Sequence, residues 1–284
     1  MRSIIGFHKD QSKEFLQWLE QTPVVYNATE SFYNLFDRQD FPKELFYGKT
    51  IVTGDFFAVE HDNIACKPFP LIHVINTETK LQPIQTFRPK RFYVSLNGAM
   101  SKVRTQFVDF LNTKFRKQGW ISYHDAGQVL PSERNKANRE RRAKWLKPQE
   151  YWLTLWDFSI ETGSQKENFI FPNITEKIWL PLKLGKPFCI FGHSGSYTFL
   201  QNYGFELYDE IIDYSFDSAD YDDQKRFKLF TNEIKKLIKQ NEPLSKETQE
   251  KIKHNKHAYK KIVREAEKQY EEIKFFGEKY SFLG

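Results

Sequence analysis

One segment of this chain, from Asn173 to Phe205, constrains its fold more than any other. It predicts a helix, a short strand, a glycine loop and a second short helix, in that order. Thr175 stands where a helix N-cap stands, because its hydroxyl can accept a hydrogen bond from a free amide of the first turn. The apolar run 187–191 has the composition of a strand buried on both faces. Gly192 and Gly195 bracket the loop that follows it.

The start of the first helix carries a carboxylate and an ammonium, Glu176 and Lys177, directly after Thr175. Both lie at the positive end of the helix dipole. Such a helix start can hold a nucleotide, with amides and Lys177 on the phosphates and Glu176 on sugar hydroxyls. An ordinary capped βα unit without a ligand explains the same residues, so that alternative stays open.

A second βα pattern precedes this segment. Residues 91–96 predict a strand, 103–115 a helix with one apolar face and 119–123 the next strand. Asn97 follows the first strand and can cap or touch a ligand. Arg104 falls in the first turn of the helix, where a phosphate would bind, or it is a solvated arginine of the helix surface.

Residues 152–160 predict a further strand that ends at Glu161. This carboxylate can orient a hydroxyl of a ligand or the ammonium of Lys177. Its other interpretation is a strand-end residue without a ligand.

The ordered motifs of these two segments resemble the donor-binding half of GT-B glycosyltransferases, most closely the fucosyltransferase-like and phage-encoded branches. The resemblance covers roughly residues 90–240. The family's loop before the arginine is richer in arginine than residues 98–102, where Lys102 is the one basic residue. The matching positions are Asn97, Arg104, Gly119, Ser122, Tyr123, Thr175, Glu176, Lys177, Pro181, Gly185, Lys186, Pro187, Phe188, Gly192, Gly195, Leu200, Gly204 and Phe205.

The resemblance implies an α/β, GT-B-like fold of two Rossmann-like domains with a cleft between them. It implies a small acceptor domain at 1–88, a nucleotide-sugar donor domain at 89–240 and C-terminal helices at 241–284 that cross back onto the first domain. The nucleotide-sugar is a co-substrate, and no metal requirement is expected. The implied donor-binding residues are Asn97, Arg104, Glu161, Thr175, Glu176, Lys177 and Gly195.

The first 88 residues predict a smaller α/β unit, with a helix at 10–19 and strands at 23–26, 50–59 and 69–75. An inverting transferase needs a base that takes the proton of the acceptor hydroxyl. Asp55, which follows a strand-like run, is the leading candidate, with Glu60 and His61 next to it. Each is also explained as a loop residue, and a retaining mechanism needs no such base.

The charge of the chain favours anionic partners. Its formal net charge is +6 and its pI is about 9.0, which suits a nucleotide, a nucleic acid or a phosphorylated glycan. The run 132–144 concentrates this charge, with Arg134, Arg139, Arg141 and Arg142 as candidate nucleic-acid contacts. A mobile, solvated loop is the other interpretation of this run.

Two cysteines, Cys66 and Cys189, make neither a disulfide framework nor a zinc site, and Cys189 is expected inside a buried strand. No signal peptide or membrane-spanning run is expected, which predicts a cytoplasmic protein, in the host cytoplasm if it is phage-encoded. The acidic residues after 205 are expected to be loop residues and helix caps: Asp209, Asp213, Asp217 and Asp220.

The leading hypothesis is therefore a nucleotide-sugar-dependent glycosyltransferase. Its acceptor is a hydroxymethylated DNA base, slightly favoured by the basic charge, or else a surface glycan or lipid-linked sugar. A non-catalytic module that binds a nucleotide or nucleic acid is the alternative from another class. The sequence carries no signal for the sugar, the stereochemistry or the oligomeric state.

Overall fold

The computed structural model describes residues 24–27, 50–53, 65–68, 71, 74, 77, 89–97, 101–123, 151, 153–161, 172 and 174–278. The chain divides into two compact units. The larger unit comprises 76–165 and 172–261, and the smaller unit comprises 1–75, 166–171 and 262–284. The predicted domain boundaries at 88/89 and 240/241, and the donor and acceptor roles of those domains, stay predictions.

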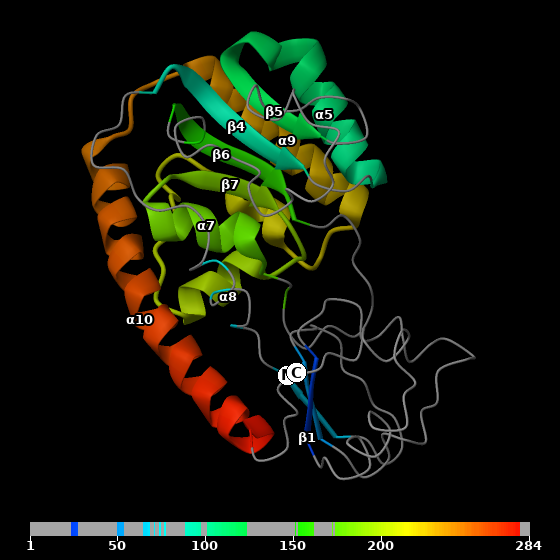
Figure 1. The fold of residues 1–284 in the computed structure, drawn as a ribbon. Coiled ribbons are helices and arrows are strands. Elements are labelled where there is room, and N and C mark those ends of the chain that lie inside the picture. The colour runs from blue at the N-terminus through cyan, green and yellow to red at the C-terminus, as the bar shows by residue number, and fades with distance from the viewer. Residues whose placement is uncertain are drawn as a thin grey trace, which may run out of the picture. The chain divides into compact units, whose positions relative to one another are not determined.

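The larger unit is built on a four-stranded parallel sheet (Figure 1). Its strands are β4 (Arg91–Asn97), β5 (Gly119–Tyr123), β6 (Thr154–Ile160) and β7 (Phe188–Phe191), in the order β5-β4-β6-β7. Neighbouring strands run parallel throughout, which confirms the predicted α/β class. The chain places β5 on one side of β4 and β6 on the other. The topological switch point therefore lies between the carboxyl ends of β4 and β6, where open α/β sheets bind their ligands.

Helices α5 (Lys102–Phe115) and α9 (Asp223–Gln240) cover one face of this sheet (Figure 1). The Phe230 ring of α9 lies 5.2 Å from the Phe107 ring of α5 and 5.4 Å from the Phe191 ring of β7. Burial of an aromatic ring of this size contributes about 2–3 kcal/mol. The residues that α5 buries have helical spacing: Phe107, Val108, Leu111 and Phe115.

Tyr93 of β4 packs against the connection between α5 and β5. Its hydroxyl donates to the Phe115 carbonyl at 3.3 Å, beside the short 3-10 turn η2 (Arg116–Gln118). A Cβ at Gly119 would overlap the Tyr93 ring. This position therefore needs glycine for lack of space.

Helix α7 (Glu176–Leu184) covers the opposite face, and the N-terminal half of α10 (Lys246–Glu278) packs against it. Trp179 donates its indole N–H to the Ile174 carbonyl at 2.9 Å, and its ring lies 6.4 Å from that of Tyr259 on α10. The apolar cluster beneath α7 consists of Val94, Tyr151, Leu180 and Leu184, with Leu96 packed against it.

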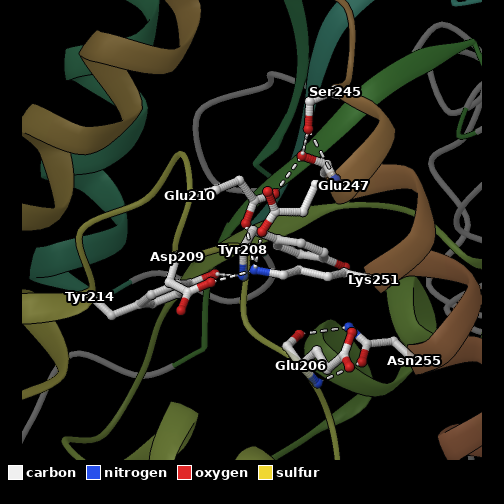
Figure 2. A network of polar contacts seen from close by, with 10 residues as sticks. Glu206, Tyr208, Asp209, Glu210, Tyr214, Ser245, Glu247, Lys251 and Asn255 are labelled. Carbon is white, nitrogen blue, oxygen red and sulfur yellow. Dashed lines mark hydrogen bonds and ion pairs between the residues drawn. The ribbon is translucent and has the colours of Figure 1, made fainter.

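Two shorter elements, α8 (Ser196–Asn202) and η6 (Tyr214–Asp217), follow β7. The chain between them is fastened to α10 by a polar network (Figure 2). Asn255 and the backbone of Glu206 exchange two hydrogen bonds of 2.8 Å. Lys251 lies among the carboxylates of Asp209, Glu210 and Glu247.

The smaller unit contains a second parallel sheet, in the order β1-β2-β3. β1 (Val24–Asn27) and β2 (Thr50–Thr53) confirm the strands predicted at 23–26 and at the start of 50–59. The strand predicted at 69–75 is wrong, because the third strand is β3 (Ala65–Pro68). Val74 and Thr77 are helical instead.

The reason for this error is the spacing of the buried residues. Leu71, Val74 and Thr77 are all fully buried, at intervals of three that place them on one face of a helix. The Val74 amide donates to the Leu71 carbonyl at 3.0 Å, as in a helical turn. A short apolar run of this kind has no period in sequence that separates strand from helix.

Cys189 is fully buried in β7, as predicted. In the part of the chain that the structure describes, no helix is both long and apolar enough to cross a membrane.

Several residues with predicted roles lie outside the described ranges, and their roles stay predictions. They are Asp55, Glu60, His61, Arg134, Arg139, Arg141 and Arg142.

Candidate functional site

Polar side chains alternate along β6 and lead to its carboxyl end. Asp157, Ser159 and Glu161 are all buried, on the side of the sheet that α7 covers. The Asp157 carboxylate accepts from the Tyr151 hydroxyl at 2.8 Å and from the Ser159 hydroxyl at 2.6 Å. Burial nevertheless raises the pKa of Asp157 to about 6, against the lowering effect of these bonds and of Lys186. A central strand thus carries polar groups up to the switch point.

The two central strands separate before they end. Pairing of β4 with β6 stops at Val94 and Asp157, whereas β4 with β5 and β6 with β7 stay paired to the last residues of β4 and β6. Beyond that point the Leu96 amide donates to the Ser159 hydroxyl at 2.9 Å instead of to a backbone carbonyl. Because buried amides need acceptors, Ser159 compensates for the lost ladder bond at the switch point.

Arg104 holds the end of β6. Its Nη2 donates to the Glu161 carbonyl at 2.6 Å and its Nε to the Ile160 carbonyl at 3.4 Å. The backbone amide of Arg104 donates a hydrogen bond of 3.3 Å to the hydroxyl of Ser101, the N-cap of α5. Arg104 is therefore a bridge from α5 to β6 rather than a solvated surface arginine. Its predicted contact with a phosphate stays a prediction.

The Glu161 carboxylate is the most constrained group of the site. The side chain is 3% exposed, and its Oε1 accepts a hydrogen bond from the Thr175 amide. Within the described residues, no donor reaches its Oε2. Burial raises the pKa of Glu161 to about 7, although Lys177 and the Thr175 hydrogen bond oppose the shift. Among the described residues this buried acceptor oxygen thus has no partner, an arrangement that is unfavourable unless another group supplies a donor.

The start of α7 confirms the predicted N-cap. Thr175 has an extended backbone, and its hydroxyl accepts from the Lys177 amide at 3.5 Å. The side chains of Glu176 and Lys177 are 31% and 13% exposed, with Oε1 and Nζ 3.8 Å apart. The structure therefore brings four of the predicted donor-binding residues together, namely Glu161, Thr175, Glu176 and Lys177.

Asn97 ends β4 at the same edge of the sheet. Its Nδ2 donates to the Ser95 hydroxyl at 2.8 Å, and its Oδ1 has no donor among the described residues. The side chain is 1% exposed. Asn97 shares the α5 side of β4 with Tyr93 and Ser95, since alternate residues of a strand point to one face. Asn97 and Glu161 therefore lie at one edge of the sheet but on opposite faces.

The glycine loop after β7 is organised by Asp217. The Gly195 amide donates to the Asp217 carbonyl at 2.9 Å, and the amides of Ser196 and Tyr197 donate to its carboxylate at 3.1 and 2.9 Å. Burial raises the pKa of Asp217 to about 7. The predicted capping role of Asp217 is confirmed. The amides of Gly195, Ser196 and Tyr197 are therefore already bonded to Asp217. The predicted contact of Gly195 with a nucleotide-sugar stays a prediction.

The lack of a side chain at Gly192 leaves room for the Glu161 side chain next to the end of β7. A Cβ at Gly192 would lie 3.1 Å from the Ser196 Oγ and 3.4 Å from the Glu161 Cβ. The first distance is shorter than ordinary van der Waals contact, so a larger residue would displace one of these neighbours. The glycine is thus explained by close packing against the carboxylate side chain.

Sequence reasoning missed the polar groups beneath Glu161. The Lys186 ammonium is buried and donates to the Tyr151 carbonyl at 2.7 Å and to the Thr154 hydroxyl at 2.7 Å. The sequence does carry a signal for Asp157, Ser159 and Glu161, because these residues alternate with apolar residues along the strand predicted at 152–160 and at its end. Three polar residues on one buried face indicate a site or a structural network.

In the described ranges, no group of three or more histidine, cysteine, aspartate or glutamate residues could hold a metal ion. No protein-family model matches this chain, and no curated protein or solved structure shows significant similarity to it. The fold and the site define a parallel α/β unit with two buried acceptor oxygens at its switch point, Asn97 Oδ1 and Glu161 Oε2, that have no donor within the described residues.

Proposed function

We propose that this protein is a GT-B-like glycosyltransferase that uses a nucleotide-activated sugar, and that the nucleotide binds at the carboxyl ends of β4 and β6. The observation that carries the proposal is the buried Oε2 of Glu161, which lacks a donor among the described residues at the switch point of a parallel sheet. Ligands of open α/β sheets bind at this place.

The chemistry of the site suits a nucleoside diphosphate. A ligand with hydrogen-bond donors would satisfy the buried Oε2 of Glu161. The hydroxyls of a ribose are such hydrogen-bond donors. Glu161 and the more exposed Glu176 are both placed to accept from them. The positive end of the α7 dipole and the Lys177 ammonium favour the negative charge of the diphosphate next to the sugar.

The same groups assist the transfer step. As the bond between the sugar and the diphosphate breaks, negative charge develops on the leaving phosphate oxygen. Lys177 and the N-terminus of α7 stabilise that charge because they are fixed before the reaction. Arg104 acts through Glu161, because its two hydrogen bonds to the end of β6 hold the backbone from which the carboxylate projects.

The acceptor half of the proposal depends on residues outside the described ranges. Asp55 is the proposed base, with Glu60 and His61 beside it, and the arginines of 132–144 are proposed to contact DNA. A hydroxymethylated DNA base is the favoured acceptor because the chain carries a net charge of +6.

The test is binding and hydrolysis of a panel of UDP-, GDP-, CMP- and dTDP-sugars by the wild type and by Lys177→Ala. The expected result is one donor that is bound and slowly hydrolysed, with affinity reduced at least tenfold in the variant. Lys239→Ala is the matched control, because this lysine is exposed and lies in the last turn of α9. No binding of any nucleotide-sugar by the wild type would refute the proposal. Binding without hydrolysis or transfer would favour a non-catalytic module.

A further inference from the structure

The middle of helix α10 is a run of basic residues without an acidic one. From Lys251 to Arg264 the sequence is KIKHNKHAYKKIVR, which contains no aspartate or glutamate. The first turns of α10 carry lysines and glutamates in i,i+4 pairs, where Lys246 lies 3.9 Å from Glu250 and Lys251 lies 3.3 Å from Glu247. This pattern stops where the basic run begins.

The basic residues of this run share one side of the helix. Lys253, His257, Lys260 and Arg264 follow one another at intervals of four, three and four, so they lie along one line on the helix surface. All four are exposed, as is Lys261 next to them. The opposite side of the helix is buried, through Asn255, Ala258, Tyr259 and Ile262. We call the exposed set of Lys253, His257, Lys260, Lys261 and Arg264 the basic face.

The described part of the protein does not neutralise the lysines and the arginine of the basic face. Across the described residues, Lys253, Lys260, Lys261 and Arg264 have no carboxylate within ion-pair distance. Lys251, at the start of the basic run, instead contacts three carboxylates (Figure 2). Like charges at i,i+4 on a helix repel one another. A row of unpaired cations therefore costs stability in the free protein and is relieved by a partner that carries opposite charge.

We propose that the basic face of α10 is a docking surface for the phosphate backbone of a nucleic-acid duplex. A helix rises 1.5 Å per residue, so the line of basic residues extends about 16 Å, in steps of about 4.5 to 6 Å. A duplex presents about one charge per 1.7 Å of its axis, enough to neutralise every cation of the face. The face exposes no aromatic or large aliphatic side chain with which to enter a membrane surface. The proposal is independent of the nucleotide-sugar site.

The test is binding of a fluorescently labelled 20-base-pair duplex, followed by anisotropy from 50 to 300 mM NaCl. The variant is Lys253→Ala, Lys260→Ala and Arg264→Ala in one chain. The matched control is Lys228→Ala, Lys239→Ala and Lys246→Ala, which removes three exposed positive charges elsewhere. Far-UV circular dichroism checks that all proteins keep their helix content.

Loss of three phosphate contacts lowers the steepness of log K against log salt by about 2.7, since each contact contributes about 0.9. The dissociation constant at 0.1 M salt rises on the order of a hundredfold, and the control changes little. An unchanged dissociation constant and salt dependence in the basic-face variant would overturn the proposal. This holds also if a separate variant with Arg139→Ala, Arg141→Ala and Arg142→Ala loses duplex binding. Preferential binding of phosphatidylserine vesicles or polyglutamate over the duplex would also overturn it.

Discussion

Replacing Glu161 by glutamine removes the buried negative charge and keeps an oxygen for the Thr175 amide. The pKa of Glu161 is raised from 4.5 to about 7, so the folded protein holds this proton more tightly than the unfolded chain does. Stability then falls as pH rises between these two values and is constant above about 7. At about 1.4 kcal/mol per pH unit, the wild type loses about 2–3 kcal/mol from this group between pH 5 and pH 8. Glu161→Gln has no such loss.

The assay is urea unfolding of the wild type and Glu161→Gln at pH 5 and pH 8, with helix content as the signal. The variant is expected to gain about 2–3 kcal/mol relative to the wild type between the two pH values. Any constant penalty from the new amide group cancels in this difference. Glu176→Gln is the control, because its carboxylate is 31% exposed. If the relative stability of Glu161→Gln is the same at both pH values, Glu161 does not carry a buried charge and the reasoning about the site fails.

Three further changes test the packing around the site by urea unfolding at pH 7. Tyr197→Phe removes the hydroxyl that bonds both the amide and the carbonyl of Ile190 on the edge of β7, and the loss is expected to be about 1–3 kcal/mol; an unchanged midpoint would contradict it. Gly119→Ala forces a Cβ against the Tyr93 ring and is expected to cost about 1–3 kcal/mol, whereas a neutral effect would show that the ring moves freely. Lys251→Met breaks the network of Figure 2 at a cost of about 1 kcal/mol that shrinks in 1 M NaCl; equal costs at low and high salt would exclude an electrostatic origin.

The elements of the larger unit were predictable because each has a clear local signal. β7 is an uninterrupted apolar run, and α5 has a single apolar face. Thr175 caps α7 through a hydroxyl and an amide two residues apart. Local signals of this kind require no knowledge of the fold. The strand predicted at 69–75 failed where no such signal exists.

The arrangement of the site was beyond prediction because its contacts join residues far apart in sequence. Arg104 bonds carbonyls 56 and 57 positions away, and Leu96 bonds a hydroxyl 63 positions away. These bonds form only once α5, β4 and β6 are assembled around the sheet, and the sequence of a single element does not determine that assembly. The sequence does show that polar residues alternate with apolar ones toward the ends of both strands. Asn97 and Glu161 are the last polar residues of these two series.

The most direct test of the central claim is a crystal structure of this protein with a bound nucleoside diphosphate, chosen from the donor panel. The account predicts a nucleotide at the carboxyl ends of β4 and β6, with a ribose hydroxyl in hydrogen-bond distance of Glu161 Oε2 and the diphosphate at the start of α7. A nucleotide bound elsewhere, with Glu161 Oε2 still lacking a donor, would contradict the account.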